Sequence, residues 1–91
     1  MNEWTYSCFQ DFCRKMRKAC PSFSFGREEA WERGVSAVSS KVHDCFHSGE
    51  PFGEQEQEAF YKKKERQYQG KYKETYLEAV EVCLNKLRTM G

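Results

Sequence analysis

Two histidines and a cysteine lie close together in the segment HDCFH, residues 43–47. His43 and His47 are four residues apart, so on a helix their imidazoles share one face and could hold one metal ion. A zinc site would need two further ligands. Cys8 and Cys13 do not supply them, because they lie about 140° apart around a helix and their spacing fits no zinc-binding pattern. We therefore expect no metal and no other cofactor, and His43 and His47 remain the only candidate pair.

Cysteines are the other residues that could do chemistry. Four of the five lie on apolar helical faces, where a thiol packs as a small hydrophobic group: Cys13, Cys20, Cys45 and Cys83. Cys8 lies at the edge of its face, and no spacing pairs it with a histidine as a nucleophile and base. The chain has no glycine-rich phosphate loop, no Ser-His-Asp pattern and no HExxH motif. The sequence thus predicts a protein that is not an enzyme.

The segment YKKKERQYQGKYKETY, residues 61–76, combines six basic residues with four tyrosines. On a continuous helix the four tyrosines would lie on one face, together with Glu54, Glu58 and Glu65. A face that carries three glutamates is not buried in a core. Because tyrosine is enriched at binding hot spots, we predict a docking strip for a larger protein. The strip consists of Tyr61, Tyr68 and Tyr72 with a charged surround of Lys62, Lys64 and Arg66.

Nucleic-acid binding is the alternative function. It would combine a basic face of the first helix with the lysines that follow Tyr61, and the residues involved would be Arg14, Lys15, Arg17, Lys18, Lys62 and Lys63. The net charge of only +1 argues against this alternative, as do lysines that point in nearly every direction around their helix. A homodimer through the tyrosine strip is a third possibility.

Three helices are expected to position these residues, over 2–20, 27–48 and 54–90. The second has the clearest apolar face, with spacings of four, three, four and three along Trp31, Val35, Val38, Val42 and Cys45. The third is interrupted only by Gly70, which costs about 1 kcal/mol in a helix. It would span roughly 55 Å, so we expect it to overhang the other two or to bend at Gly70. The loop before the second helix contains Phe23 and Phe25, which we expect to cover the core.

The chain of 91 residues is expected to form one all-α domain, a three-helix fold with a long C-terminal helix. The first residues show no signal-peptide pattern, and no apolar run is long enough for a membrane span. Five cysteines without a secretion signal indicate reduced thiols and a cytoplasmic location. We therefore predict a small intracellular binding protein that docks on a larger protein and modulates it, as adaptors and phage-type inhibitors of host enzymes do.

Overall fold

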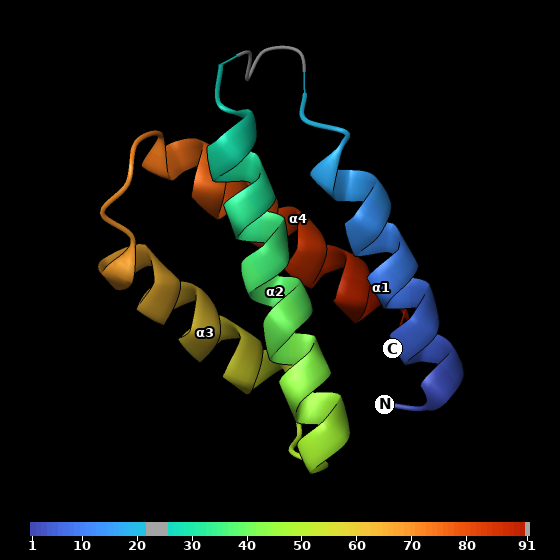
Figure 1. Ribbon diagram of the computed structural model, residues 1–91. Helices are drawn as coiled ribbons and strands as arrows, with labels where there is room; N and C mark the ends of the chain where they lie inside the picture. The colour runs from blue at the N-terminus through green and yellow to red at the C-terminus, as the bar shows by residue number, and fades with distance from the viewer. Residues whose placement is uncertain (22–25, 91) are drawn as a thin grey trace.

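The structure, a computed structural model, describes residues 1–21 and 26–90. These residues contain four helices (Figure 1). Their bounds are α1 Glu3–Arg17, α2 Glu28–Ser48, α3 Glu54–Gln67 and α4 Lys73–Met90. No strand occurs in these two ranges, so the all-α prediction is confirmed. Phe23 and Phe25, which we expected to cover the core, lie outside the described residues.

The prediction of three helices, with a single long helix over 54–90, is wrong. The backbone leaves helical geometry at Tyr68, where φ is −74° and ψ is 121°, and becomes helical again at Lys73. The segment therefore forms α3 and α4, which run antiparallel to each other (Figure 1). Folding back lets α3 bury Phe60 and Gln57, which an overhanging helix would leave in water.

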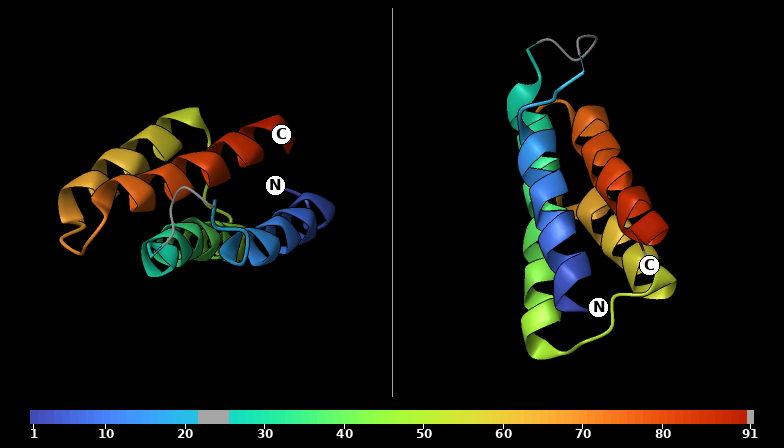
Figure 2. Two further views of the ribbon diagram at one scale, coloured as in Figure 1. Left: turned by 90° about the horizontal axis from the view of Figure 1, so that it is seen from above. Right: turned by 90° about the vertical axis from the view of Figure 1, so that its right-hand side faces the viewer.

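The four helices are arranged in two layers, with α1 beside α2 and α3 beside α4 (Figure 2). The most extensive contact joins α2 to α4, and α3 packs mainly on α4. The N-terminus of α1 and the C-terminus of α4 lie at the same end of the molecule (Figure 1). Within the described ranges, no helix has both the length and the apolar character that crossing a bilayer requires.

The helix ends follow local capping chemistry. Asn2 caps α1, since its side-chain oxygen accepts a 2.7 Å hydrogen bond from the backbone N–H of Thr5. The α1 helix stops at Arg17, three residues before the predicted end. Gly49 ends α2 with a φ of 77°, a left-handed conformation that glycine adopts without strain. The predicted apolar face of α2 is confirmed, because all five of its residues are buried, namely Trp31, Val35, Val38, Val42 and Cys45.

The buried face of α3 differs from the face that carries the glutamates. Glu54, Glu58 and Glu65 are exposed, as the sequence predicts. The neighbouring face turns inward instead, with Gln57 and Phe60 buried and with Tyr61 and Lys64 half-buried. This face has helical spacing, but a glutamine and a lysine are among its four residues. Because of these two polar residues, apolar periodicity does not identify this face in the sequence.

Hydrogen bonds make the burial of Gln57 tolerable. Its side-chain NH₂ donates to the backbone oxygen of Phe52 at 2.9 Å, and its side-chain oxygen accepts from Nε of Arg88 at 2.8 Å. A buried amide costs little when its polar atoms have partners. Gln57 thereby ties the start of α3 both to the preceding loop and to the last turns of α4.

The helices α2 and α4 approach each other most closely at Gly34. A Cβ placed there would lie 2.4 Å from the backbone oxygen of Tyr76 and 2.7 Å from Cβ of Ala79. Neither neighbour can rotate away, because one is backbone and the other is the first side-chain atom. Glycine is therefore required for this helix crossing.

We expect Gly34→Ala to lower the free energy of unfolding by about 2 kcal/mol. Because neither clashing neighbour can move, the added methyl group should cost about 3 kcal/mol, the upper end of the usual range. The gain of about 1 kcal/mol in helix propensity offsets part of this cost. Urea denaturation monitored by circular dichroism would measure the change. Gly53→Ala is the control, because a Cβ there meets only the side chain of Glu56 at 3.6 Å. Gly53 is the N-cap of α3, so this change should cost less than about 1 kcal/mol. Equal stability of the two variants would contradict the proposed close crossing.

Candidate docking surface

A tight corner, residues 68–72, connects α3 to α4. The ring of Tyr68 stacks on the ring of Tyr76, with centroids 4.0 Å and planes 10° apart. The Tyr68 hydroxyl donates a 2.7 Å hydrogen bond to the backbone oxygen of Lys71 and so closes the corner. Gly70 lies against the Tyr68 ring, because a Cβ at this position would come within 2.7 Å of the hydroxyl oxygen. Tyr68 therefore holds the corner together, and burial of Tyr76 raises the pKa of that phenol.

Tyr72 is the exposed aromatic residue of this corner. Its φ of 61° is the only positive φ of a non-glycine residue in the described ranges. This conformation costs roughly 1–2 kcal/mol for a residue with a Cβ. The side chain remains 45% exposed, and the guanidinium of Arg27 lies 4.7 Å from the centre of its ring. Arg27 also donates a 3.4 Å hydrogen bond to the hydroxyl of Thr75, so it links the start of α2 to the start of α4.

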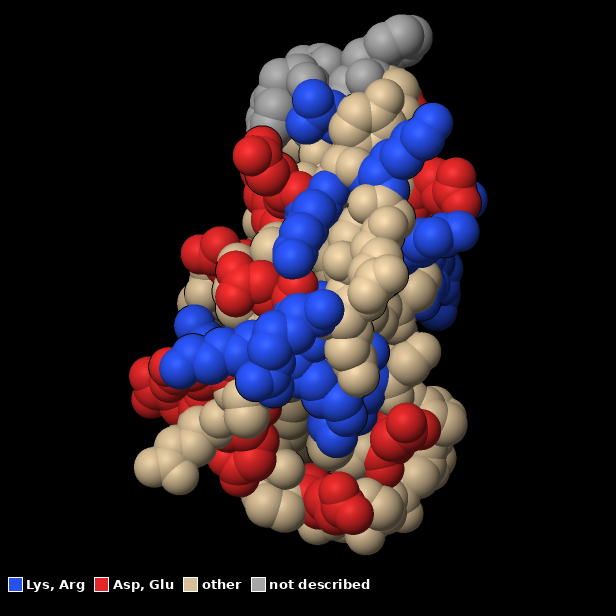
Figure 3. Space-filling model, turned by 90° about the vertical axis from the view of Figure 1, so that its left-hand side faces the viewer, with Lys and Arg blue, Asp and Glu red and all other residues tan. Residues whose placement is uncertain are grey.

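A hollow of about 420 Å³ lies between the corner and the first turns of α2. Its charged lining comprises Arg27, Arg33 and Lys71 against a single carboxylate, Glu29. Arg33 forms a 2.7 Å ion pair with Glu29, so Arg27 and Lys71 contribute uncompensated positive charge to the hollow. We call Tyr72, Arg27 and Lys71 the Tyr72 corner. On the side of the molecule where α3 and the corner lie, a band of Lys and Arg side chains crosses the surface (Figure 3).

The predicted tyrosine strip is not continuous, because the helix that would align it is broken. Tyr61 is half-buried and lines a different hollow, together with Leu84. Burial raises the pKa of the Tyr61 phenol, and the nearby Glu81 and Glu65 raise it further. Tyr68 packs on Tyr76, which leaves Tyr72 as the one member of the predicted set with a largely exposed ring.

The predicted charged surround belongs to α3 and does not line the hollow at Tyr72. Lys62 forms a 3.2 Å ion pair with Glu58, one turn earlier on an exposed surface. Such a pair contributes only a few tenths of a kcal/mol, roughly 0.3–0.5. The ammonium of Lys64 lies 5.4 Å from the ring centre of Phe60, and Arg66 is exposed in the last turn.

The cations of the nucleic-acid alternative lie on two different flanks of the molecule. Arg14 pairs with Asp11 at 3.0 Å, and Nε of Arg17 donates to the hydroxyl of Ser36 at 3.0 Å. These two residues lie on α1 with the exposed Lys15, and the exposed Lys18 follows as the C-cap of the helix. Figures 1 and 2 place α1 and α3 on opposite sides of α2 and α4, so Lys62 and Lys63 do not join the α1 cluster.

Two thiols meet in the core between α1 and α4. A hydrogen bond with Cys83 lowers the pKa of Cys13, and the same hydrogen bond and burial raise the pKa of Cys83. Both side chains have no exposed surface. A nucleophile must reach its substrate, so this pair packs the core and is not placed for catalysis.

The histidine pair lies in the last turns of α2, where both imidazoles are exposed. Their ring centroids are 4.3 Å apart. Among the residues that the structure describes, no group of three or more His, Cys, Asp or Glu side chains is arranged to hold a metal ion.

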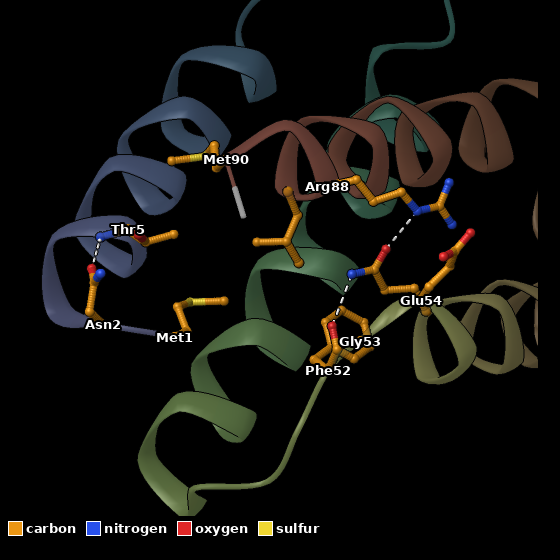
Figure 4. Close-up of a pocket in the computed structure, with 10 residues that line it drawn as sticks. Met1, Asn2, Thr5, Phe52, Gly53, Glu54, Arg88 and Met90 are labelled. Atoms are coloured by element: carbon orange, nitrogen blue, oxygen red, sulfur yellow. Dashed lines mark hydrogen bonds between the residues drawn. The ribbon is translucent and has the colours of Figure 1, made fainter.

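Two exposed apolar residues near the N-terminus were missed by the reasoning from sequence. Trp4 is 72% exposed, and Met1 is exposed beside it. The helical angle of Trp4, on the side opposite Phe9 and Cys13, is the signal that could have identified it. Nearby, a hollow of about 830 Å³ separates α1 from the start of α3 and the end of α4. Figure 4 shows Met1, Met90 and Phe52 around this hollow, with Arg88 on its rim.

No family model, no curated protein and no solved structure matches this chain.

The strained backbone of Tyr72 predicts an unusual order of stability among variants. Tyr72→Gly and Tyr72→Ala both remove the ring, but only glycine relieves the positive φ. We expect the glycine variant to be the more stable by about 1 kcal/mol, after allowing for the entropy that glycine loses on folding. Thermal and urea denaturation of both variants would measure this difference.

Ser40, exposed in the middle of α2, supplies the matched control. There the order reverses, because Ser40→Ala should be more stable than Ser40→Gly by about 1 kcal/mol. If alanine were the better residue at both positions, Tyr72 would not hold the left-handed conformation in solution.

Proposed function

We propose that this protein is a non-enzymatic binding protein that docks on a larger protein through the Tyr72 corner and modulates its activity. The observation that carries the proposal is an exposed tyrosine ring held by a strained backbone, with a cationic hollow beside it. A rigid aromatic side chain buries a large area at low entropic cost, which favours its use as a hot spot.

The packing around the corner supports this role because it fixes the ring before a partner arrives. Tyr68 is locked by its stacking on Tyr76 and by its hydrogen bond to Lys71. Tyr72 is the next residue after Lys71, and the guanidinium of Arg27 lies over its ring. A surface that needs no ordering on binding keeps more of its contact energy as affinity. Backbone strain of this kind is retained where the conformation is useful.

The positive charge of the hollow indicates what kind of partner surface would fit it. Arg27 and Lys71 carry positive charge that nothing in the lining of the hollow compensates. An acidic patch beside an apolar pocket for the tyrosine ring would complement them, and complementary charge would speed association. Cys8, Cys13, Cys45 and Cys83 are free thiols, which suits action in the reducing cytoplasm.

We expect Tyr72→Ala to weaken partner binding at least tenfold, because loss of a hot-spot residue costs more than about 1–2 kcal/mol. The test begins with photo-crosslinking from position 72 in lysate, followed by identification of the adduct. Titration of the purified partner with wild-type protein and variants then gives affinities. Lys71→Glu should weaken binding mainly through slower association.

Trp4→Ala is the matched control, because it removes an exposed aromatic ring near the far end of the molecule. It should leave affinity unchanged. Binding that survives Tyr72→Ala but is lost in Trp4→Ala would overturn the proposal and move the site to α1. Capture that disappears with nuclease, with affinity falling steeply with salt, would instead establish the nucleic-acid function. Sedimentation of the free protein would show whether it is a homodimer.

A further inference from the structure

The two imidazoles near the C-terminal end of α2 are held in place by aromatic neighbours from two helices. The ring of Tyr6, on α1, stacks on Phe46 with centroids 4.2 Å apart. Tyr6 also meets His47 edge-on at 5.9 Å, and Phe46 meets His47 edge-on at 5.4 Å. His43 lies 6.3 Å from the Tyr6 ring. These contacts restrict the rotation of both histidines, so the pair is partly ordered without a ligand.

The separation of the rings determines which coordination geometry they fit. A metal ion lies about 2.1 Å from a ligating imidazole nitrogen, and therefore about 3.2 Å from the ring centre. Two imidazoles at 90° around the metal would have centres about 4.5 Å apart, whereas a tetrahedral angle would place them about 5.2 Å apart. The observed 4.3 Å matches the right-angled arrangement. Neighbouring ligands also meet at right angles around octahedral ions. Among the ions that prefer nitrogen ligands, Cu²⁺ and Ni²⁺ adopt square-planar or tetragonal geometry.

A carboxylate lies next to the pair. Oδ1 of Asp44 is 3.6 Å from Nδ1 of His43, so its negative charge adds to the attraction of the pair for a cation. We propose that His43 and His47 form a two-imidazole binding site for a divalent ion of tetragonal preference, with water in the remaining positions. The site is separate from the Tyr72 corner.

The test is isothermal titration of the 91-residue chain with Ni²⁺, which the thiols do not reduce. We expect one ion per chain, and roughly hundredfold weaker binding in His43→Gln and in His47→Gln, because the second contact of a chelate acts within one molecule. The double variant His47→Gln with Ser48→His keeps two histidines but moves one to another face, and it should bind as weakly as His47→Gln. Equal affinity in the wild type and this double variant would overturn the proposal.

Two further measurements locate the ion independently of these variants. Cys8→Ser should bind Ni²⁺ as the wild type does, and a large loss in this variant would assign the site to the thiol. Nuclear magnetic resonance with substoichiometric Ni²⁺ should broaden the signals of His43, His47 and Tyr6 before all others. Earlier broadening around Met1 would assign the site to the terminal amine. Circular dichroism would check that each variant keeps the helical content of the wild type.

Discussion

The close crossing of α2 and α4 at Gly34 is the constraint on which the rest of the structure depends. With a hydrogen in place of a side chain, α2 can bring its backbone against the carbonyl of Tyr76 and the methyl group of Ala79. Trp31 before Gly34 and the valines Val35 and Val38 after it are then buried and exclude water from the core. A crossing this close also determines where the first turns of α4 lie, since Tyr76 belongs to them.

The position of Tyr76 determines the corner in turn. Its ring is the surface on which Tyr68 stacks, and the Tyr68 ring in turn lies against Gly70. The chain must then turn back within a few residues, and Tyr72 takes up the left-handed conformation that completes the turn. The exposed tyrosine is thus linked to the core packing at Gly34, because Tyr72 lies about two helical turns before Ala79 along the chain.

How far the sequence predicts this fold depends on how local the decisive interactions are. The helix α2 is predicted almost to the residue, because its apolar face repeats regularly from Trp31 to Cys45. The break between α3 and α4 is not, because Gly70 alone weakens a helix by only about 1 kcal/mol. What breaks the helix is the stacking of Tyr68 on Tyr76, together with burial of Phe60, and both depend on tertiary packing. Tyr72 could be selected from the sequence because it lies in the tyrosine-rich segment itself. Arg27 could not, because only tertiary packing brings it to the Tyr72 ring.

The Tyr72 corner and the histidine pair lie at opposite ends of α2. Their separation determines whether binding at one site can affect the other. Arg27 caps the first turn, and His47 lies in the last, about 30 Å away along the axis. Coupling between such sites needs an element with two alternative arrangements that both sites influence. The helix between them offers none, because its inner face is continuously packed and Gly34 permits no sliding against α4 without a clash. A metal ion at one end should therefore stabilise the packing of Tyr6 on Phe46 and leave the geometry of the Tyr72 corner unchanged.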